Sequence, residues 1–258
     1  SNDILWPGKP KYLAKTSGTT SGAKYIPITK ESMPNHILSS RNALLFYIHE
    51  TGDTSFLDGK TFFLQGSPVL VKINGILLGR LSGIVAHHIP SYLRKNNLPT
   101  LKTNSIVDWE EKVNEICNET INENMTVIGG IPSWIQMYFE KLIIKSKKKN
   151  IGKLFKNLKL YVYGGVNFSP YEKIFSKLIG KKINTIEYYP ASEGFFAYQN
   201  SQNNKALLLQ YNSGIYYEFI KPEEFGKGKY ERYNLNNVEI GVNYILIVSS
   251  NAGLWAYN

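Results

Sequence analysis

The chain has one cysteine, Cys117, among its 258 residues. A single thiol excludes an intramolecular disulfide, and its apolar neighbours predict a buried position on a helix rather than a reactive one. Long apolar runs are also missing, so no segment is typical of a membrane span. The polar start, Ser1-Asn2-Asp3, lacks the basic and apolar regions of a signal peptide. We therefore expect a cytoplasmic protein that does not enter a membrane.

Acidic residues are few: 20 Asp and Glu stand against 30 Lys and Arg, which gives a formal net charge of +10. Such an excess would suit a nucleic acid, an anionic membrane surface or a small polyanion. Its densest run, Lys145-Ser146-Lys147-Lys148-Lys149, ends an expected helix, where cations complement the helix dipole and stay solvated. The sequence has no basic and aromatic stripe and no known nucleic-acid module. We therefore expect no nucleic-acid partner and look for a small polyanion.

A segment rich in glycine and hydroxyl residues lies near the start, Lys15-Thr16-Ser17-Gly18-Thr19-Thr20-Ser21-Gly22-Ala23-Lys24. Its backbone N–H groups, hydroxyls and cationic ends are suited to wrapping a polyphosphate. It is not a helix-opening P-loop, because three residues rather than four separate the glycines and Ala23 precedes Lys24. Aromatic and β-branched residues on both sides predict strands. We interpret the segment as a mobile hairpin that closes over phosphates; a flexible surface turn is the alternative.

The order of the segments after this hairpin predicts an α/β fold. A helix over 30–50 comes first, and Ile37, Leu38, Leu44, Leu45 and Ile48 are expected to supply much of its apolar face. Buried strands over 61–64 and 69–71 and a helix over 108–123 follow. Strands and helices then alternate, over 126–128, 132–146, 158–163, 170–179 and 183–189. Such an order is typical of a doubly wound, mostly parallel sheet with right-handed crossovers. Ser169 and Glu172 have the spacing of a capping box.

The pattern changes after residue 194. Short strands with turn signals are expected over 195–198, 206–210, 215–220, 238–248 and 254–257. They predict an antiparallel β subdomain, a barrel or a curved sheet, packed beside the first region. We therefore distinguish an α/β nucleotide-binding region, 1–194, from an antiparallel region, 195–258, although no linker clearly separates the two.

Two expected strand ends carry candidate ligand groups, and ligands of parallel sheets bind beyond such ends. Gly164 and Gly165 follow one strand and permit a flat ligand to approach the backbone. Tyr189-Pro190-Ala191-Ser192-Glu193 follows the next strand and supplies an aromatic ring, a hydroxyl and a carboxylate. Tyr188 and Tyr189 point to opposite faces of a strand, so one of them is expected in the core.

These motifs, together with the closing Gly253-Leu254-Trp255-Ala256-Tyr257, resemble the adenylate-forming superfamily. They are most similar to the GH3 acyl acid-amido synthetases, in a bacterial version, from about Tyr12 to the end of the chain. The resemblance implies the fold of the N-terminal domain of an adenylate-forming enzyme. It also implies two half-reactions. A carboxylic acid and ATP give an acyl-adenylate and pyrophosphate, and an amine, usually an amino acid in relatives, then takes the acyl group.

The resemblance implies roles for individual residues. Lys24, Ser192 and Glu193 are the implied catalytic residues: Lys24 holds the β- and γ-phosphates, and Ser192 contacts the α-phosphate. Glu193 is implied to bind Mg²⁺, a hard cation suited to a carboxylate and phosphate oxygens. Tyr189 matches the aromatic residue that stacks on adenine. The residues implied to bind ATP are Thr16, Ser17, Gly18, Thr19, Thr20, Ser21, Gly22, Lys24, Gly164, Gly165, Tyr189, Ser192 and Tyr257.

The sequence departs from the family pattern at Asn258, because the aspartate expected to bind the ribose would follow it. The family's N-terminal segment and mobile C-terminal domain are also not recognised, so we expect an incomplete enzyme with weak ATP binding and little turnover. Two other functions stay open: an acyl-CoA ligase with the same adenylation step, and a non-catalytic nucleotide- or acyl-binding module. His87 and His88 are adjacent and are not expected to hold one metal ion together; we interpret them as loop residues or a wall of the acyl pocket.

Overall fold

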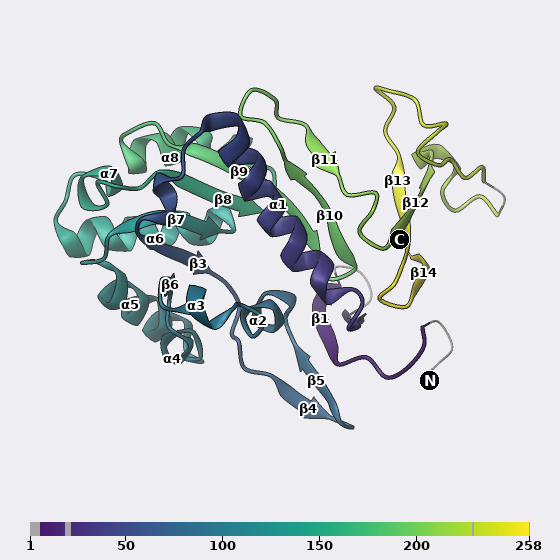
Figure 1. The fold of residues 1–258 in the computed structure, drawn as a ribbon, viewed down its shortest axis with the longest axis horizontal. Coiled ribbons are helices and arrows are strands. Elements are labelled where there is room, and N and C mark those ends of the chain that lie inside the picture. The colour runs from purple at the N-terminus through teal and green to yellow at the C-terminus, as the bar shows by residue number, and fades with distance from the viewer. Residues whose placement is uncertain (1–5, 19–21, 229, 258) are drawn as a thin grey trace.

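The central layer of the molecule is a seven-stranded sheet (Figure 1). The computed structural model describes residues 6–18, 22–228 and 230–257. The strand order is β11-β10-β9-β8-β7-β3-β6. The five neighbouring strands β9, β8, β7, β3 and β6 are parallel, whereas β10 is antiparallel to β9 and β11 is antiparallel to β10. Their bounds are β3 (Lys60–Leu64), β6 (Asn97–Leu98), β7 (Met125–Gly130), β8 (Leu160–Gly164), β9 (Asn184–Ala191), β10 (Gly194–Gln199) and β11 (Leu207–Leu209).

Helices cover both faces of this sheet, which confirms the doubly wound α/β fold. Successive residues of β8 point to opposite faces, so Tyr161 and Val162 belong to different core clusters. The Tyr161 cluster lies under α5 (Trp109–Thr120), α6 (Pro132–Ser146) and α8 (Glu172–Ile179). The Val162 cluster lies under α1 (Met33–Thr51), with Ala43 and Tyr47 packed on the strands. The sheet is therefore buried on both sides, as its apolar strands predict.

Two smaller sheets lie beside the main one. The first has the order β2-β1-β5-β4 and is formed by β1 (Tyr12–Gly18), β2 (Gly22–Ile28), β4 (Val71–Ile73) and β5 (Ile76–Gly79). The other, which we call the third sheet, has the order β12-β13-β14, with β12 (Ile215–Ile220), β13 (Ile245–Ser250) and β14 (Leu254–Tyr257). The remaining short elements are η1 (Ser55–Leu57), α2 (Leu81–Ala86), α3 (Ser91–Arg94), α4 (Leu101–Asn104), α7 (Ile151–Leu154), η2 (Ser169–Tyr171) and η3 (Pro222–Glu224).

The antiparallel strands are distributed differently from the expectation. β10 and β11 extend the main sheet, and β12, β13 and β14 form the separate antiparallel sheet. The boundary expected between 194 and 195 therefore lies inside the β9–β10 hairpin, where Gly194 pairs with Ala191. The strand expected over 238–248 begins later, at Ile245.

Two other local expectations were wrong. The apolar residues of 69–71 do not form a buried strand: β4 starts at Val71 and lies at the edge of its sheet, with Val71 55% and Ile73 52% exposed. The capping box is not formed either. The Ser169 N–H binds Asn167, and the Glu172 carboxylate accepts a hydrogen bond from Lys205 at 3.0 Å.

The single cysteine has the expected place. Cys117 is buried on α5, and burial raises the pKa of its thiol to about 11, so it is a poor nucleophile. Within the described ranges, no helix has both the length and the apolar character needed to cross a membrane.

Candidate functional site

The hydroxyl-rich segment lies on a β-hairpin, as its flanking residues predict. β1 and β2 pair in antiparallel register from Tyr12 opposite Ile28 to Gly18 opposite Gly22. Thr16 pairs with Lys24. Thr19, Thr20 and Ser21, and the side chain of Ser17, lie outside the described part of the chain, so their predicted phosphate contacts stay predictions.

One face of the hairpin leads from the core to the end at which the sequence predicts phosphate binding. Tyr12, Ala14, Ile26 and Ile28 are buried in a cluster that also receives Leu254 and Tyr257 from β14. Side chains alternate along a strand, so Thr16 and Lys24 continue this buried face toward the Gly18–Gly22 end of the hairpin. Lys24 is half-buried there, and its ammonium lies 5.0 Å from the centre of the Tyr257 ring. The first and last predicted motifs therefore meet.

The two glycines at the end of β8 are both required, for different reasons. Gly164 pairs with Tyr188 of β9, and a Cβ atom built on Gly164 would lie 2.3 Å from the Tyr188 carbonyl oxygen. Gly165 has a φ of +83°, which residues with a side chain rarely adopt, and a Cβ atom built on it would lie 3.9 Å from Ile131. The backbone at this strand end is therefore open to a flat ligand beside Gly165.

Ser192 and Glu193 form the two-residue turn between β9 and β10. Tyr188 turns toward α1, where its hydroxyl donates to the Ser40 carbonyl oxygen at 2.9 Å and burial raises its pKa. Tyr189 points the other way and is 49% exposed, with its ring edge-on to Phe196 at 5.4 Å. The alternation of the two tyrosines is thus as expected, and the adenine contact of Tyr189 stays a prediction.

Glu193 is the residue predicted to hold Mg²⁺. Among the described residues, no three His, Cys, Asp or Glu side chains gather into a metal-binding group. One half-buried carboxylate at a turn nevertheless fits Mg²⁺, which usually takes one or two protein carboxylates and completes its shell with phosphate oxygens and water. The histidine pair makes separate contacts: His87 bonds to the Pro68 carbonyl oxygen at 2.8 Å, and His88 to the Tyr12 hydroxyl at 3.1 Å.

A bulge in β10 joins the parts of the site. The pairing of β10 with β9 shifts between Phe195 and Ala197, and this shift leaves Phe196 as the extra residue. Phe195 packs on the α1 side of the sheet, whereas Phe196 packs against Ile215, Tyr217 and Val248 of the third sheet. Ala191 and Tyr257 lie against this same cluster. The β9–β10 turn and the end of β14 are therefore held by one core.

A cavity of about 640 Å³ that the sequence motifs do not indicate lies between α8 and strands β8 to β10. Its walls include Tyr163 and Glu187, whose hydroxyl and carboxylate are hydrogen-bonded at 3.1 Å. Burial and the Glu187 charge raise the pKa of Tyr163. Glu187 is two residues before Tyr189 and so lies on the same face of β9. This alternation was the one signal in the sequence that could have placed Glu187 beside Tyr189. None of the predicted site residues lines the cavity.

Solved structures with this fold include two of a GH3.15 acyl acid amido synthetase. The first match covers 99% of this chain and 53% of the synthetase chain, at 17% identity and a TM-score of 0.73. The other, in complex with 2,4-DB, has the same identity and coverage and a TM-score of 0.74. A 2-hydroxyisobutyryl-CoA ligase in an open conformation, with 2-HIB-AMP and CoA, is 14% identical, with 93% and 48% coverage and a TM-score of 0.55. The chain thus spans about half the length of these proteins.

The sequence itself matches two domains of one family. Residues 1–96, which include the hairpin, match the GH3 family N-terminal domain. Residues 208–258, which include the third sheet, match the GH3 family central domain. No curated protein matches the sequence. Because the two matches together cover more than half of the chain and its fold is shared with GH3 structures, this chain belongs to the GH3 family.

Proposed function

We propose that this chain forms the nucleotide-binding part of a ligase that activates a carboxylic acid with ATP and transfers the acyl group to an amine. The observation that carries the proposal is the contact between Lys24 and Tyr257, beside the cluster that also holds the β9–β10 turn. A phosphate-binding cation, a hydroxyl and a carboxylate thereby belong to one region. Family membership and the names of the acyl acid amido synthetases support the same reaction.

In the first half-reaction, a carboxylate oxygen of the acid attacks the α-phosphorus of ATP. The bond to the bridging oxygen breaks, and pyrophosphate leaves with the negative charge. The Lys24 ammonium and the backbone N–H groups of the hairpin would stabilise that charge, which grows in the transition state. Ser192 would contact the α-phosphate, and Glu193 would hold Mg²⁺, which supplies positive charge beside the phosphates.

The adenine would lie against the end of β8. Gly165 has no side chain there that would keep the base from the backbone, and Tyr189 offers an exposed ring on the neighbouring strand. Stacking on an aromatic ring would fix the base while the hairpin holds the other end of the nucleotide. In the second half-reaction, the amine nitrogen attacks the acyl carbonyl carbon, AMP leaves with the bonding electrons, and the nitrogen loses a proton.

The first prediction tests the carboxylate of the β9–β10 turn. In the full-length protein, Glu193→Ala should lower acid-dependent exchange of pyrophosphate into ATP by about 100-fold or more, because a group that stabilises transferred charge is lost. The measurement is a screen of carboxylic acids for exchange, followed by the variant with the best acid. Glu223→Ala, on exposed η3, is the matched control and should keep the wild-type rate.

Exchange in Glu193→Ala at the wild-type rate would remove Glu193 from the mechanism. An absence of exchange with every acid would contradict the adenylation step itself. Amino acids and coenzyme A are then compared as acceptors. Formation of the amide with an amino acid supports the ligase proposed here, whereas a thioester with coenzyme A would identify an acyl-CoA ligase.

A further inference from the structure

The Tyr257 ring is the group against which Lys24 rests. The ammonium lies 5.0 Å from the ring centre, a distance at which a cation is attracted to the face of an aromatic ring. Lys15, on the other strand of the hairpin, pairs with Tyr25 and so points to the opposite face from Lys24. Lys15 and Lys24 lie at the two ends of the hydroxyl-rich segment. Within the described part of the chain, only Lys24 of these two has its ammonium over an aromatic ring.

The backbone before Tyr257 is held in an uncommon conformation. Ala256 has a φ of +46°, in the left-handed region that costs a residue with a Cβ atom free energy. Its N–H donates to the Ser249 hydroxyl at 2.9 Å, and the pairing of β13 with β14 shifts between Val248 and Ser250. Such outliers persist only where the surroundings fix them, and they often lie at functional sites. The direction of the Tyr257 ring is thus set by its strand.

The ring is also fixed by packing on two sides. Tyr257 lies against the hairpin cluster, which contains Tyr12 and Ile28, and against the Phe196 cluster of the third sheet. A long lysine side chain loses conformational freedom when it is held in one place, and a fixed ring lowers that cost at the moment of binding. Tyr257 therefore has the properties of a support for a flexible cation.

We propose that Tyr257 is a positioning residue, which holds the Lys24 ammonium where the β- and γ-phosphates of ATP bind. The proposal rests on the proposed function for its choice of ligand, and it gives Tyr257 a role through Lys24 rather than a direct contact with the nucleotide. Its chemistry depends on the aromatic face and does not depend on the hydroxyl. Phenylalanine should therefore replace Tyr257, and an aliphatic residue should not.

The second prediction follows, and it uses ATP binding, which needs no catalysis. In the full-length protein, Tyr257→Leu should raise the Kd for ATP about tenfold, while Tyr257→Phe should restore binding to within about twofold of the wild type. In a Lys24→Met background, Tyr257→Leu should cause no further loss, because the two residues act as a unit. Calorimetric titration with ATP gives each Kd. Tyr216→Leu, an exposed aromatic position on β12, is the matched control.

A second measurement reads the contact without any nucleotide. After ¹³C-methylation of lysines, the Lys24 signal, identified by its loss in Lys24→Arg, should be shifted upfield by the ring current of residue 257. The shift should persist in Tyr257→Phe and disappear in Tyr257→Leu. A Lys24 signal that is the same in wild type and Tyr257→Leu would overturn the proposal.

The affinities can also overturn it. A wild-type Kd in Tyr257→Leu would remove the positioning role, and a loss in Tyr257→Phe equal to that in Tyr257→Leu would assign the role to the hydroxyl. A further loss in the Lys24→Met background would show that Tyr257 acts independently of Lys24. Failure of the proposed function is distinguishable from all of these, since it appears as ATP binding without acid-dependent pyrophosphate exchange.

Discussion

Gly164 and Gly165 show at the scale of single residues how neighbouring glycines can be required for different reasons. At Gly164 the obstacle to a side chain is the Tyr188 carbonyl oxygen, which a Cβ atom would approach to 2.3 Å. At Gly165 the obstacle is the backbone conformation, with φ at +83° and room for a Cβ atom. The motif was recognisable in the sequence, but only the pairing of β8 with β9 separates these two causes.

The third prediction compares the two positions. Gly164→Ala should lower the free energy of unfolding by about 2–3 kcal/mol, because β9 must move away. Gly165→Ala should cost about 1 kcal/mol, the price of a left-handed backbone conformation. Urea unfolding gives both values. Gly226→Ala, at φ +85° and with no atom within 4 Å of the new Cβ, is the control for the backbone effect alone. Equal losses at Gly164 and Gly226 would contradict the steric argument.

Among the elements, α1 differs most from its sequence pattern. Ile37, Leu38, Leu44, Leu45 and Ile48 were expected to supply much of its apolar face, yet Leu38 and Leu45 are exposed. The fully buried residues are Met33, His36, Ser39, Ala43 and Tyr47, and of the expected set Leu44 and Ile48 pack beside them. Apolar residues occur all around this helix, so periodicity could not select the right side. The packing of α1 on the sheet determines which side is buried, and that side includes His36.

The fourth prediction concerns that histidine. His36 is 4% exposed, its Nδ1 has no hydrogen-bond partner among the described residues, and burial lowers its pKa to about 4. The ordinary value of about 6.5 applies to the unfolded chain, which therefore takes up the proton first as the pH falls. The stabilisation that neutral His36 gives the folded state is therefore complete above about pH 6.5. Between pH 6.5 and 4 the free energy of unfolding falls by about 3 kcal/mol.

Urea unfolding from pH 7.5 to 4.5 measures this loss. His36→Gln should flatten the dependence of the unfolding free energy on pH, whatever its stability at neutral pH. His49→Gln, at an exposed position near the end of the same helix, should keep the wild-type slope. If His36→Gln loses stability with pH as steeply as the wild type does, His36 is not the titrating group.

Other elements were predictable because their signals are local. α6 has the expected bounds, with Pro132 in its first turn and lysines after its last. β9 and β12 also lie where their apolar residues indicate. The hairpin was recognisable from its flanks. β4 was not, because Val71 and Ile73 have the side chains of a buried strand but occupy a sheet edge. An edge strand and a central strand differ in their place in the strand order of the sheet, and a local sequence pattern does not reveal that order.

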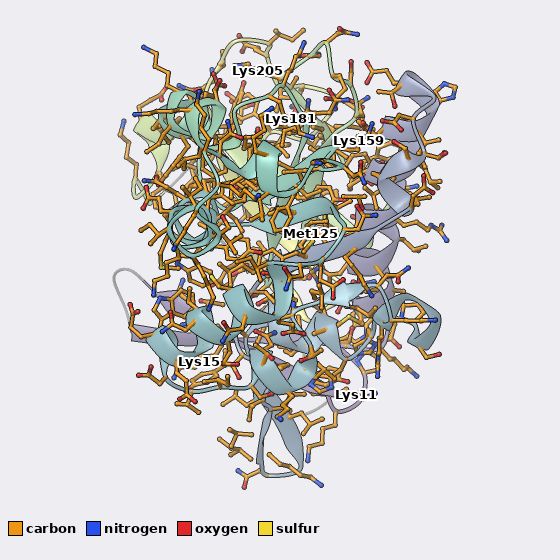
Figure 2. The ribbon with its side chains drawn as sticks, turned by 90° about the vertical axis from the view of Figure 1, so that its left-hand side faces the viewer. Lys11, Lys15, Met125, Lys159, Lys181 and Lys205 are labelled. Atoms are coloured by element: carbon orange, nitrogen blue, oxygen red, sulfur yellow. The ribbon has the colours of Figure 1, made fainter. Side chains whose placement is uncertain are left out.

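At the scale of the whole molecule, much of the positive charge lies away from the proposed nucleotide site. Lys147, Lys148 and Lys149 are exposed after α6, and Lys181 precedes β9, at the edge where the parallel strands begin. Figure 2 shows Lys159, Lys181 and Lys205 at one end of the molecule and Lys15 at the other. The proposed ligand groups follow the carboxyl ends of the strands. A count of charges in the sequence could not separate these two sets.

The fifth prediction follows from that separation. Fields of exposed charges are screened within about 8 Å at physiological salt. A variant with Lys147, Lys148 and Lys149 all changed to Gln should therefore keep its Kd for ATP within about twofold at 0.15 M salt. Calorimetric titration of the full-length protein provides the test, with Lys24→Met as the comparison that should weaken binding. A large loss in the triple variant would mean that these lysines contribute to the site after all.

The residues proposed for the candidate site could be chosen from the sequence, but their arrangement in space could not. Its motifs lie on strands of three sheets, and the sequence indicated each motif separately. What brings Tyr257 to Lys24 is the bulge at Phe196 and the packing of the third sheet on it, together with the unusual backbone of Ala256. Each of these depends on contacts between segments distant in sequence. The role inferred for Tyr257 accordingly came from the structure.

The contact between Lys24 and Tyr257 also has a consequence for the newly made protein. A ribosome releases a chain from its N-terminus, so β1 and β2 emerge before β14, with the other described strands made between them. Until Leu254 and Tyr257 arrive, one side of the hairpin cluster is without its partners, and Lys24 has no ring against which to rest. We therefore expect a nascent chain to lack this contact, and with it the proposed support of Lys24, until β14 has emerged.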